Sequence, residues 1–430
     1  MKLVKMSLAA VLLGASAFAI DNVKVSGDAK LYYYTDNKDK PAGTAKDGLF
    51  GQSNSAADTA LRLGVTGDLT KGVSFGMTGY AVSALGLENN LVSNTWTGAH
   101  TMGAGVNEQA WMGELWLAAT MGKTSAKIGR MELDTPLAFS EKWSVVPNTF
   151  EAAVLINQDL PDTTLVGAWV GRGNGVNAVG GFGNAVQNHT TTSLGIDGYM
   201  GDGAVFGTFA SRGAYAAALI NNSFKPLTFQ AWYYDVMDIA DAYWLQADIN
   251  CQLVKGLTIG AQYADMSPKG ALNTIPAIKD SDAYAVKLGY GVDKLKVAAA
   301  YSKADKDGTL KIANVATGNL ATAQSKLYTE AYWNYGYVGR AGADSYMVSA
   351  DFDAGIAKLG AQYTNVSAKA TGATVSTDMQ EIALTASKSF GPLDATLAYF
   401  STKADDQNIK AGATTGSRYD SVLAMLQLNF

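Results

Sequence analysis

Cysteine and histidine are nearly absent from this chain of 430 residues. Cys251 is the one cysteine, so an intramolecular disulfide and a zinc or redox motif built on cysteine pairs are excluded. The two histidines, His100 and His189, lie in stretches rich in glycine, asparagine and threonine that read as loops. A nucleophile with a base fixed beside it is therefore not evident. We expect no enzyme activity, no cofactor and no metal site.

Long apolar runs are also missing after residue 20, where none reaches the length of a transmembrane helix. The beginning of the chain differs. Two lysines within the first five residues precede an apolar stretch at 6–15, and Ala-Phe-Ala at 17–19 is a small-x-small cleavage sequence. An anchoring helix would need a longer apolar stretch. We therefore predict a signal peptide at residues 1–19 and a mature chain at 20–430.

Basic residues are fewer than acidic residues. The chain has 33 basic and 38 acidic residues, and loss of the two leader lysines changes the net charge from −5 to 31 − 38 = −7. This balance argues against nucleic acid as a partner, because binding it requires a basic surface. Proline is scarce, while glycine and tyrosine are abundant. A large soluble all-β protein would have a similar composition, so composition alone does not decide the class.

What the chain does contain is a repeated strand pattern. Residues 257–263 and 357–363 alternate apolar with small or polar side chains and end in tyrosine; further copies lie at 227–233, 295–301 and 393–399. Such alternation indicates a strand with one apolar and one polar face. Six residues at ~3.3 Å each span about 20 Å, close to the ~25 Å lipid-facing band of a membrane barrel. The tyrosine then falls where an interfacial aromatic belt is expected.

The final segment carries the same pattern, with Val422, Ala424, Leu426, Leu428 and Phe430 on one face. As an open edge, such a strand would invite aggregation, whereas in a closed barrel the last strand pairs with the first.

The connections between these strands are asymmetric. One end of each hairpin has a short turn, as at 254–256, 292–293 and 391–392. The other ends meet long polar stretches at 36–56, 86–108, 173–189, 268–280, 305–343 and 404–416. Short periplasmic turns and long extracellular loops are typical of outer-membrane barrels. We predict an all-β, transmembrane, antiparallel up-and-down β-barrel of 18–20 strands; a β-sandwich or propeller is the alternative.

Strand parity also predicts which side chains face the lumen. A charge on the lipid face near the middle of the membrane would cost ~2–4 kcal/mol for lysine or arginine, so charged residues should point inward there. The alternative is a plugged interior whose charges pair with one another. The predicted pore-lining residues are Arg62, Glu114, Asp248, Lys287, Lys296, Asp351, Lys358 and Glu381, with further inward charges at Lys24, Asp28, Lys30, Asp68 and Lys294.

The segment at 130–150 is unlike the other long connections. It has two prolines, the bulky Phe139 and Trp143, and almost no glycine, which suits a loop folded against protein. We predict that residues 134–149 fold into the lumen and narrow it. The alternative is a packed external loop at a subunit contact. The predicted constriction residues are Arg130, Glu132, Asp134, Glu141 and Lys142.

Several segments resemble known families. The leader Met-Lys-Leu-Val-Lys, the sequence at 25–32 and the aromatic run at 332–346 resemble the campylobacter-type major outer membrane porins. Pro147-Asn-Thr-Phe150 with the preceding Pro136 resembles the inward-folding third loop of the substrate-specific porins of pseudomonads. Both resemblances imply 18 strands. The first implies a general, mildly cation-preferring trimer. The second implies a basic residue before the Pro-x-Thr-Phe sequence, where this chain has Lys142, and a ladder of wall arginines, of which this chain has few.

These observations predict a general diffusion porin of the bacterial outer membrane, weakly cation-preferring and homotrimeric. Its partners would be outer-membrane lipid, small hydrophilic solutes and ions. The alternative is a substrate-selective channel for small organic acids or amino acids, which needs an oriented run of basic residues. An adhesive role of exposed loops is a third possibility, suggested by the aromatic residues at 328–337.

Overall fold

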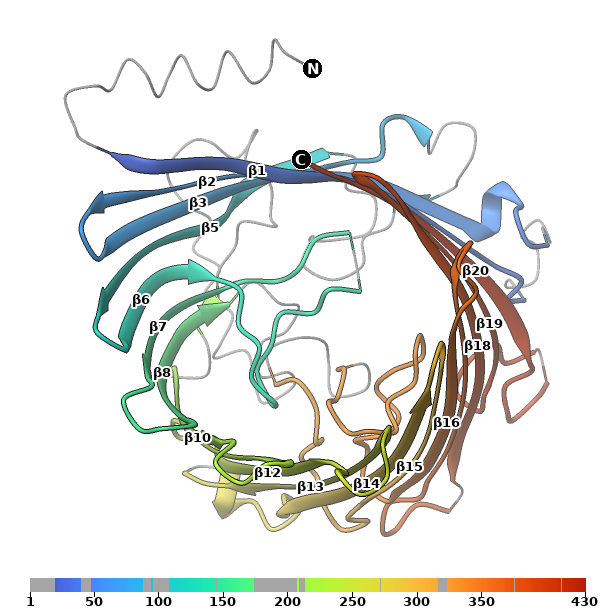
Figure 1. Ribbon diagram of the computed structural model, residues 1–430. Coiled ribbons are helices and arrows are strands. Elements are labelled where there is room, and N and C mark those ends of the chain that lie inside the picture. The colour runs from blue at the N-terminus through green and yellow to red at the C-terminus, as the bar shows by residue number, and fades with distance from the viewer. Residues whose placement is uncertain are drawn as a thin grey trace.

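The computed structural model describes residues 20–39, 48–87, 94–95, 108–143, 145–173, 207–208, 213–270, 272–315, 323–374, 376–410 and 412–430. The predicted signal peptide, His100 and His189 lie outside these residues. Within them, eighteen long antiparallel strands form one closed barrel (Figure 1). The strands are β1 (Asp21–Asp36), β2 (Ser55–Thr70), β3 (Val73–Ser83), β5 (Glu108–Met121), β6 (Thr124–Met131), β7 (Phe150–Asn157), β8 (Thr163–Gly173), β10 (Ala214–Asn221), β11 (Leu227–Val236), β12 (Ala240–Asn250), β13 (Leu257–Pro268), β14 (Ser281–Val292), β15 (Leu295–Ala304), β16 (Ala343–Asp353), β17 (Lys358–Ala368), β18 (Thr377–Phe390), β19 (Leu393–Ala404) and β20 (Tyr419–Asn429).

In the part of the chain that the structure describes, four short elements accompany the barrel strands. Two-residue strands, β4 (Asn94–Thr95) and β9 (Gly207–Thr208), pair with β2 and β8, respectively. Two single 3₁₀ turns, η1 (Gln52–Asn54) and η5 (Leu272–Thr274), lie in connections between strands. In the residues that the structure describes, no helix is long and apolar enough to cross a membrane.

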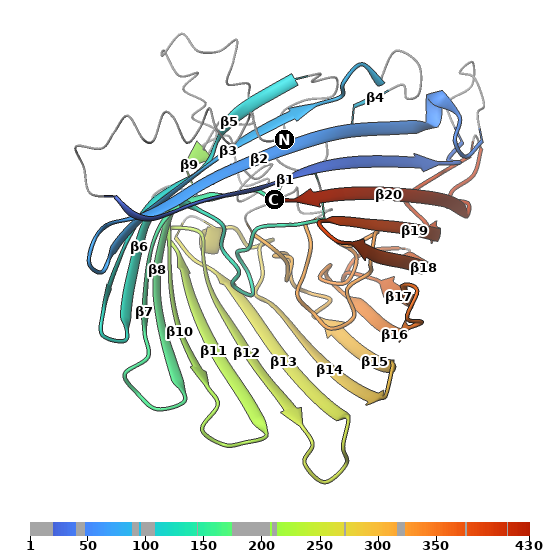
Figure 2. The ribbon, with the colours of Figure 1, turned by 45° about the horizontal axis from the view of Figure 1, so that its top comes forward.

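The barrel closes through its first and last strands, which Figure 2 shows side by side. β1 and β20 pair in antiparallel register, with Leu31 opposite Leu426 and Asp28 opposite Asn429. Gly27 and Phe430 exchange two backbone hydrogen bonds of 2.8 and 3.0 Å at the end of this seam. The prediction that the last strand pairs with the first is confirmed, and the strand number is the lower of those expected.

The two ends of the barrel differ as predicted. At one end the strands are joined by two to six residues, for example 71–72 between β2 and β3 and 251–256 between β12 and β13, where Cys251 lies. At the other end the connections are mostly long, including 132–149 and 305–342; the exception is 237–239 between β11 and β12. The short turns mark the periplasmic end.

The strand pattern separates an apolar outer face from an inner face covered by protein. Tyr263, Tyr284 and Tyr346 are exposed on the outside, in line with apolar residues such as Leu288 and Val348 on the same faces of their strands. The fully buried side chains include Tyr32 and Trp244, which point inward. Two interior loops cover these inward side chains, so the main hydrophobic clusters lie inside the ring of strands.

Candidate channel constriction

Two long loops enter the interior of the barrel, as the view along it in Figure 1 shows. We call residues 132–149 loop L3 and residues 305–342, of which 305–315 and 323–342 are described, loop L7. L3 connects β6 to β7 and crosses the lumen. The Tyr32 hydroxyl of β1 donates a 2.7 Å hydrogen bond to the Trp143 carbonyl, and Leu137 N donates to the Tyr234 hydroxyl of β11 at 3.4 Å. L3 is thus attached to the inner faces of two distant strands.

L3 and L7 hold each other through Asn314. Its side-chain amide donates to the Phe139 carbonyl at 2.9 Å and to Glu141 Oε1 at 3.0 Å. Next to it, Val315 N donates to the Leu137 carbonyl at 2.9 Å. The two loops therefore form one body inside the barrel.

Glu381 attaches L7 to the wall. This β18 side chain is 1% exposed, and its carboxylate accepts hydrogen bonds from Trp333 N (2.9 Å), Asn334 N (2.7 Å) and the Asn334 side-chain amide (2.9 Å). A buried carboxylate with three donors is a strong attachment, because each such bond is charge-assisted. Glu381 was predicted to line the pore; it points inward but lies beneath L7.

A second attachment lies across the lumen at Tyr328. Its hydroxyl donates to Asp248 Oδ1 at 2.6 Å, and Lys287 Nζ lies 4.1 Å from its ring centroid. The ring fits because β13 has Gly260 here: a Cβ at this position would lie 2.6 Å from Tyr328 Cζ. Two of the predicted pore-lining residues, Asp248 and Lys287, therefore contact L7.

Aromatic side chains pack L7 against L3 and the wall. The Trp333 ring stacks on Phe400 of β19 and Tyr34 of β1, each at 5.2 Å between centroids, and Trp143 of L3 meets it edge-on at 6.1 Å. Tyr335 lies 5.2 Å from Trp143. The aromatic residues at 328–337 thus lie inside the barrel, and the suggestion that they form an exposed adhesive surface is corrected.

L7 also contains a buried charged pair that sequence reasoning missed. The Glu330 carboxylate accepts hydrogen bonds from Ser325 N at 2.7 Å, Ala331 N at 3.1 Å and Gly336 N at 3.3 Å. Burial raises the pKa of Glu330 to about 7 and lowers the pKa of Lys311 to about 7, and the two charges attract each other. Both groups lie within L7, where the Glu330 carboxylate connects residues 325, 331 and 336 of the loop.

Charged side chains gather where L3 meets the wall formed by β1 and β2. Arg62 of β2 binds Asp28 Oδ2 at 2.6 Å and Glu132 Oε1 at 3.4 Å, and Lys142 Nζ binds Glu132 Oε2 at 2.8 Å. Lys30 is 8% exposed and interacts electrostatically with Arg62, Asp28 and Glu132. We call these five residues the lumen charge cluster. It unites three predicted site residues, Arg62, Glu132 and Lys142.

Other predicted site residues are near this cluster or distant from it. Glu114 of β5 accepts a 3.3 Å hydrogen bond from Thr78 and interacts electrostatically with Glu132 and Arg62. Asp134 is exposed and forms an ion pair with Lys326 of L7. Glu141 is 3% exposed; it accepts a 2.7 Å hydrogen bond from the Trp143 indole of L3 and, from L7, the bond of Asn314, so it joins the two loops.

Three predicted pore-lining residues lie toward the periplasmic end, away from L3. Lys296 of β15 is opposite Asp351 of β16, and Lys358 of β17 is opposite Asp353. Their side chains point inward: the adjacent residues Val297, Phe352 and Leu359 are exposed on the outside, and side chains alternate along a strand. They belong to the wall below the loops.

Arg130 does not face the constriction. Lys127, on the inner face of β6, lies 4.2 Å from the ring of Trp116, whereas Ile128 is 60% exposed on the outer face. Arg130 shares the parity of Ile128 and binds Glu151 Oε1 at 2.9 Å. The prediction that Arg130 lies at the constriction is therefore wrong, because the alternation of β6 places its side chain on the outer face.

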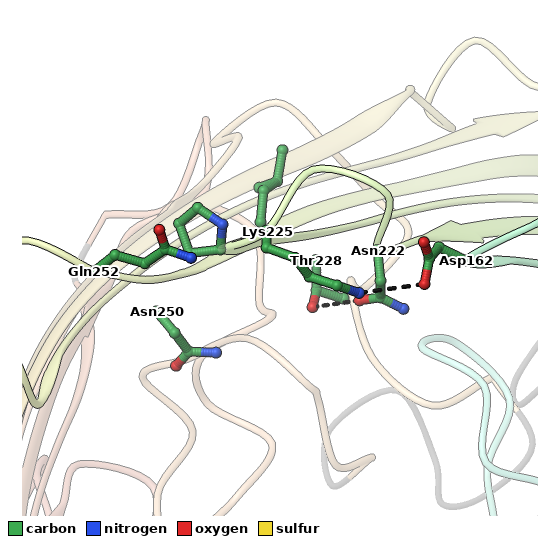
Figure 3. Close-up of a pocket in the computed structure, with 8 residues that line it drawn as sticks. Asp162, Asn222, Lys225, Thr228, Asn250 and Gln252 are labelled. Carbon is green, nitrogen blue, oxygen red and sulfur yellow. Dashed lines mark hydrogen bonds and ion pairs between the residues drawn. The ribbon is translucent and has the colours of Figure 1, made fainter.

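A separate cavity of about 500 Å³, with a mixed polar and apolar lining, lies at the periplasmic turns (Figure 3). The Lys225–Asp162 ion pair (3.3 Å) and a 2.7 Å hydrogen bond from Thr228 to Asn222 lie at its edge. Asn250 and the turn residue Gln252 complete its polar lining (Figure 3). It is formed by turns at the end of the barrel remote from L3.

Comparison with known proteins gives a family and a fold. A family model described as Gram-negative porin matches residues 7–325. The fold is similar to that of OccK9 (OpdG) from Pseudomonas aeruginosa (TM-score 0.72, 14% identity, 95% of this chain and 99% of that chain). It is also similar to a BenF-like porin from Pseudomonas fluorescens Pf-5 (0.71, 11%, 95% and 98%) and to outer membrane protein opdK from P. aeruginosa (0.69, 13%, 95% and 98%). Comparison with curated proteins finds no match.

Proposed function

The chain belongs to the Gram-negative porin family, a family of outer-membrane channels and not of enzymes, and we propose that it is a substrate-selective channel for small organic acids or amino acids. One observation carries this proposal: the lumen charge cluster presents both signs of charge beside two loops that lie inside the barrel. A wide, general pore does not need a second interior loop. A pore narrowed in this way brings solutes against the charged side chains.

The cluster suits solutes that carry a carboxylate. The Lys142 side chain is 67% exposed, and Arg62 is 24% exposed, so both offer donors to an anionic group passing L3. Glu132 lies between them and would attract the ammonium group of an amino acid. Arginine and carboxylate match in geometry, so Arg62 adds orientation to attraction.

Single-channel recording tests this proposal. In a planar bilayer, glutamate and succinate are expected to interrupt the current in a concentration-dependent way, whereas uncharged glycerol is not. Lys142→Gln removes the most exposed cation of the cluster and should shorten the interruptions by roughly 3- to 10-fold, the loss of an exposed charge-assisted contact. Lys358→Gln, on the wall below the loops, is the control. Equal currents with and without the acids would exclude selective binding.

The second candidate function is general diffusion with a weak cation preference. It is favoured by the net charge of the chain and by Asp134, whose side chain is 82% exposed. If it holds, Asp134→Asn should move the reversal potential in a tenfold salt gradient toward zero by a few millivolts, since one exposed charge is partly screened. Glu141→Gln is expected to act differently, because Glu141 is buried and joins L3 to L7. A reversal potential that Asp134→Asn leaves unchanged would remove Asp134 from the selectivity region.

We further propose a homotrimer related to the campylobacter-type porins, as the sequence resemblance implies. Conductance steps that appear in threes on insertion would support it. Single steps of uniform size would favour a monomer.

A further inference from the structure

A group of three charged side chains lies on the outside of the barrel, near the extracellular ends of β6, β7 and β8. Glu151 of β7 binds Arg130 of β6 at 2.9 Å through Oε1 and approaches Arg172 of β8 to 3.8 Å through Oε2. Arg130 Nη1 also donates to the Met112 carbonyl at 3.1 Å. The Arg172 side chain is 57% exposed. This outer arginine cluster has a net charge of +1 and is unused by the channel function.

Neighbouring side chains show that the cluster faces away from the lumen. Ile128 and Leu155, at the same parity as Arg130 and Glu151, are 60% and 50% exposed. The intervening residues on β7 and β8, Ala152 and Val170, are buried in an interior hydrophobic cluster. A register shift between Glu151 and Ala152 turns Arg172 to the same side as Glu151.

The position of the outer arginine cluster along the membrane normal corresponds to the lipid headgroup region. Trp169 of β8 and Tyr215 of β10 lie opposite each other on the outer face, as members of an interfacial aromatic belt would. Trp169 pairs with Ala153 of β7, which in turn pairs with Ile128 of β6, so these three residues lie at the same depth in the membrane. Arg130 and Glu151 each come two residues further toward the extracellular end, about 7 Å along the strand. Charges at this depth cost ~0–1 kcal/mol, far less than at the membrane centre.

A long arc of the described rim has the opposite character. From β11 to β20, aspartates occupy the outer face just beyond the tyrosines; Tyr233, for example, donates to Asp241 at 2.9 Å and Tyr399 to Asp420 at 2.8 Å. Lysines such as Lys269, which binds two of these aspartates, balance them in part. The members of this row are Asp235, Asp241, Asp265, Asp282, Asp344, Asp378 and Asp420. An anionic headgroup approaching the barrel is repelled along this arc and attracted at β6–β8.

We propose that the outer arginine cluster binds a phosphate of an anionic glycolipid in the outer leaflet, such as lipopolysaccharide. Arg172 is the exposed donor and Arg130 the second, and Glu151 holds both guanidinium groups in position. Guanidinium groups bind phosphate through paired, charge-assisted hydrogen bonds, which an ammonium does not provide. The inference is independent of the solute that the channel passes.

Binding of purified lipopolysaccharide to the detergent-folded protein tests the proposal. Native mass spectrometry should detect lipopolysaccharide bound to the wild type. The double variant Arg130→Gln/Arg172→Gln should bind at least roughly tenfold more weakly, as expected for the loss of charge-assisted bonds. Lys388→Gln is the matched control, since Lys388 lies on the same outer surface at the periplasmic end, 5.2 Å from the Phe390 ring. Its binding should equal that of the wild type.

Two further measurements make the outcome decisive. Arg172→Lys keeps the charge but loses the planar donor pair, and should bind with intermediate affinity; it also serves if the double variant fails to fold. Inorganic phosphate should not compete at millimolar concentration, because the site is built at the lipid boundary. Equal lipopolysaccharide binding by wild type and the arginine variants, or full competition by free phosphate, would overturn the proposal.

Discussion

Replacing Glu381 with alanine is expected to release loop L7 from the barrel wall and to raise the single-channel conductance severalfold. The substitution removes three hydrogen bonds to a carboxylate and leaves Trp333 N and Asn334 N without that acceptor. Each charge-assisted bond is worth ~1.5–3 kcal/mol, and because bonds to one carboxylate are not additive, we take a loss of about 3 kcal/mol for the three together. A shift of that size raises the released population by roughly 100-fold. Since Asn314 of L7 also binds L3, release of L7 would remove one support of L3, which stays attached to β1 and β11.

Conductance and proteolysis together measure this release. The Glu381→Ala protein should pass larger currents, show more open-channel noise, and be cut within L7 by a protease that leaves the wild type intact. Thr385→Ala is the control, because Thr385 lies further along the same inner face of β18, beside Gly360. A variant with wild-type conductance and protease resistance would show that the aromatic contacts of Trp333 hold L7 without Glu381.

Replacing Arg62 with glutamine is expected to abolish interruption of the current by carboxylates and to shift the reversal potential toward cations. Arg62 forms ion pairs with both Asp28 and Glu132, and Asp28 is 5% exposed. Removing one partner of a buried ion pair costs about 3–5 kcal/mol, so the cluster would rearrange as well as lose its positive charge. The effect should exceed that of any other single substitution in the lumen charge cluster.

Arg62→Lys separates charge from geometry. Lysine keeps the positive charge but cannot bind Asp28 and Glu132 through one planar group. We expect a reversal potential near that of the wild type, with weakened carboxylate block. If Arg62→Gln leaves both quantities unchanged, solutes do not pass the lumen charge cluster, and the substrate-selective proposal loses its main support.

The fold could be predicted from the sequence because its signal is local. Alternation over six or seven residues identifies a strand and both of its faces, and this rule places Arg62 and Asp351 inside. The same rule applied from Ile128 would have placed Arg130 outside. The aromatic character of the 130–150 segment misled here, since it was treated as one unit although its first residues complete β6.

The interior loops could be predicted only in part. L3 has a composition that suits packing against protein. L7 is polar and glycine-containing over much of its length, and the residues that fix it, Asp248, Glu381 and Phe400, lie far from it in sequence. Its aromatic residues therefore looked available for an external partner. Nor does sequence indicate that Glu141 is buried, because its partner Asn314 belongs to a different loop.

The seam between β1 and β20 is the pairing expected to form last. Its pairing joins strands from opposite ends of the chain, so it is the contact of longest sequence separation and the slowest to find. L3 contacts β1 and β11, and L7 contacts β1, β12 and β18, so the two loops join strands that lie far apart in the sequence across the interior. β1, which forms the seam, is thereby also held from the inside by both loops.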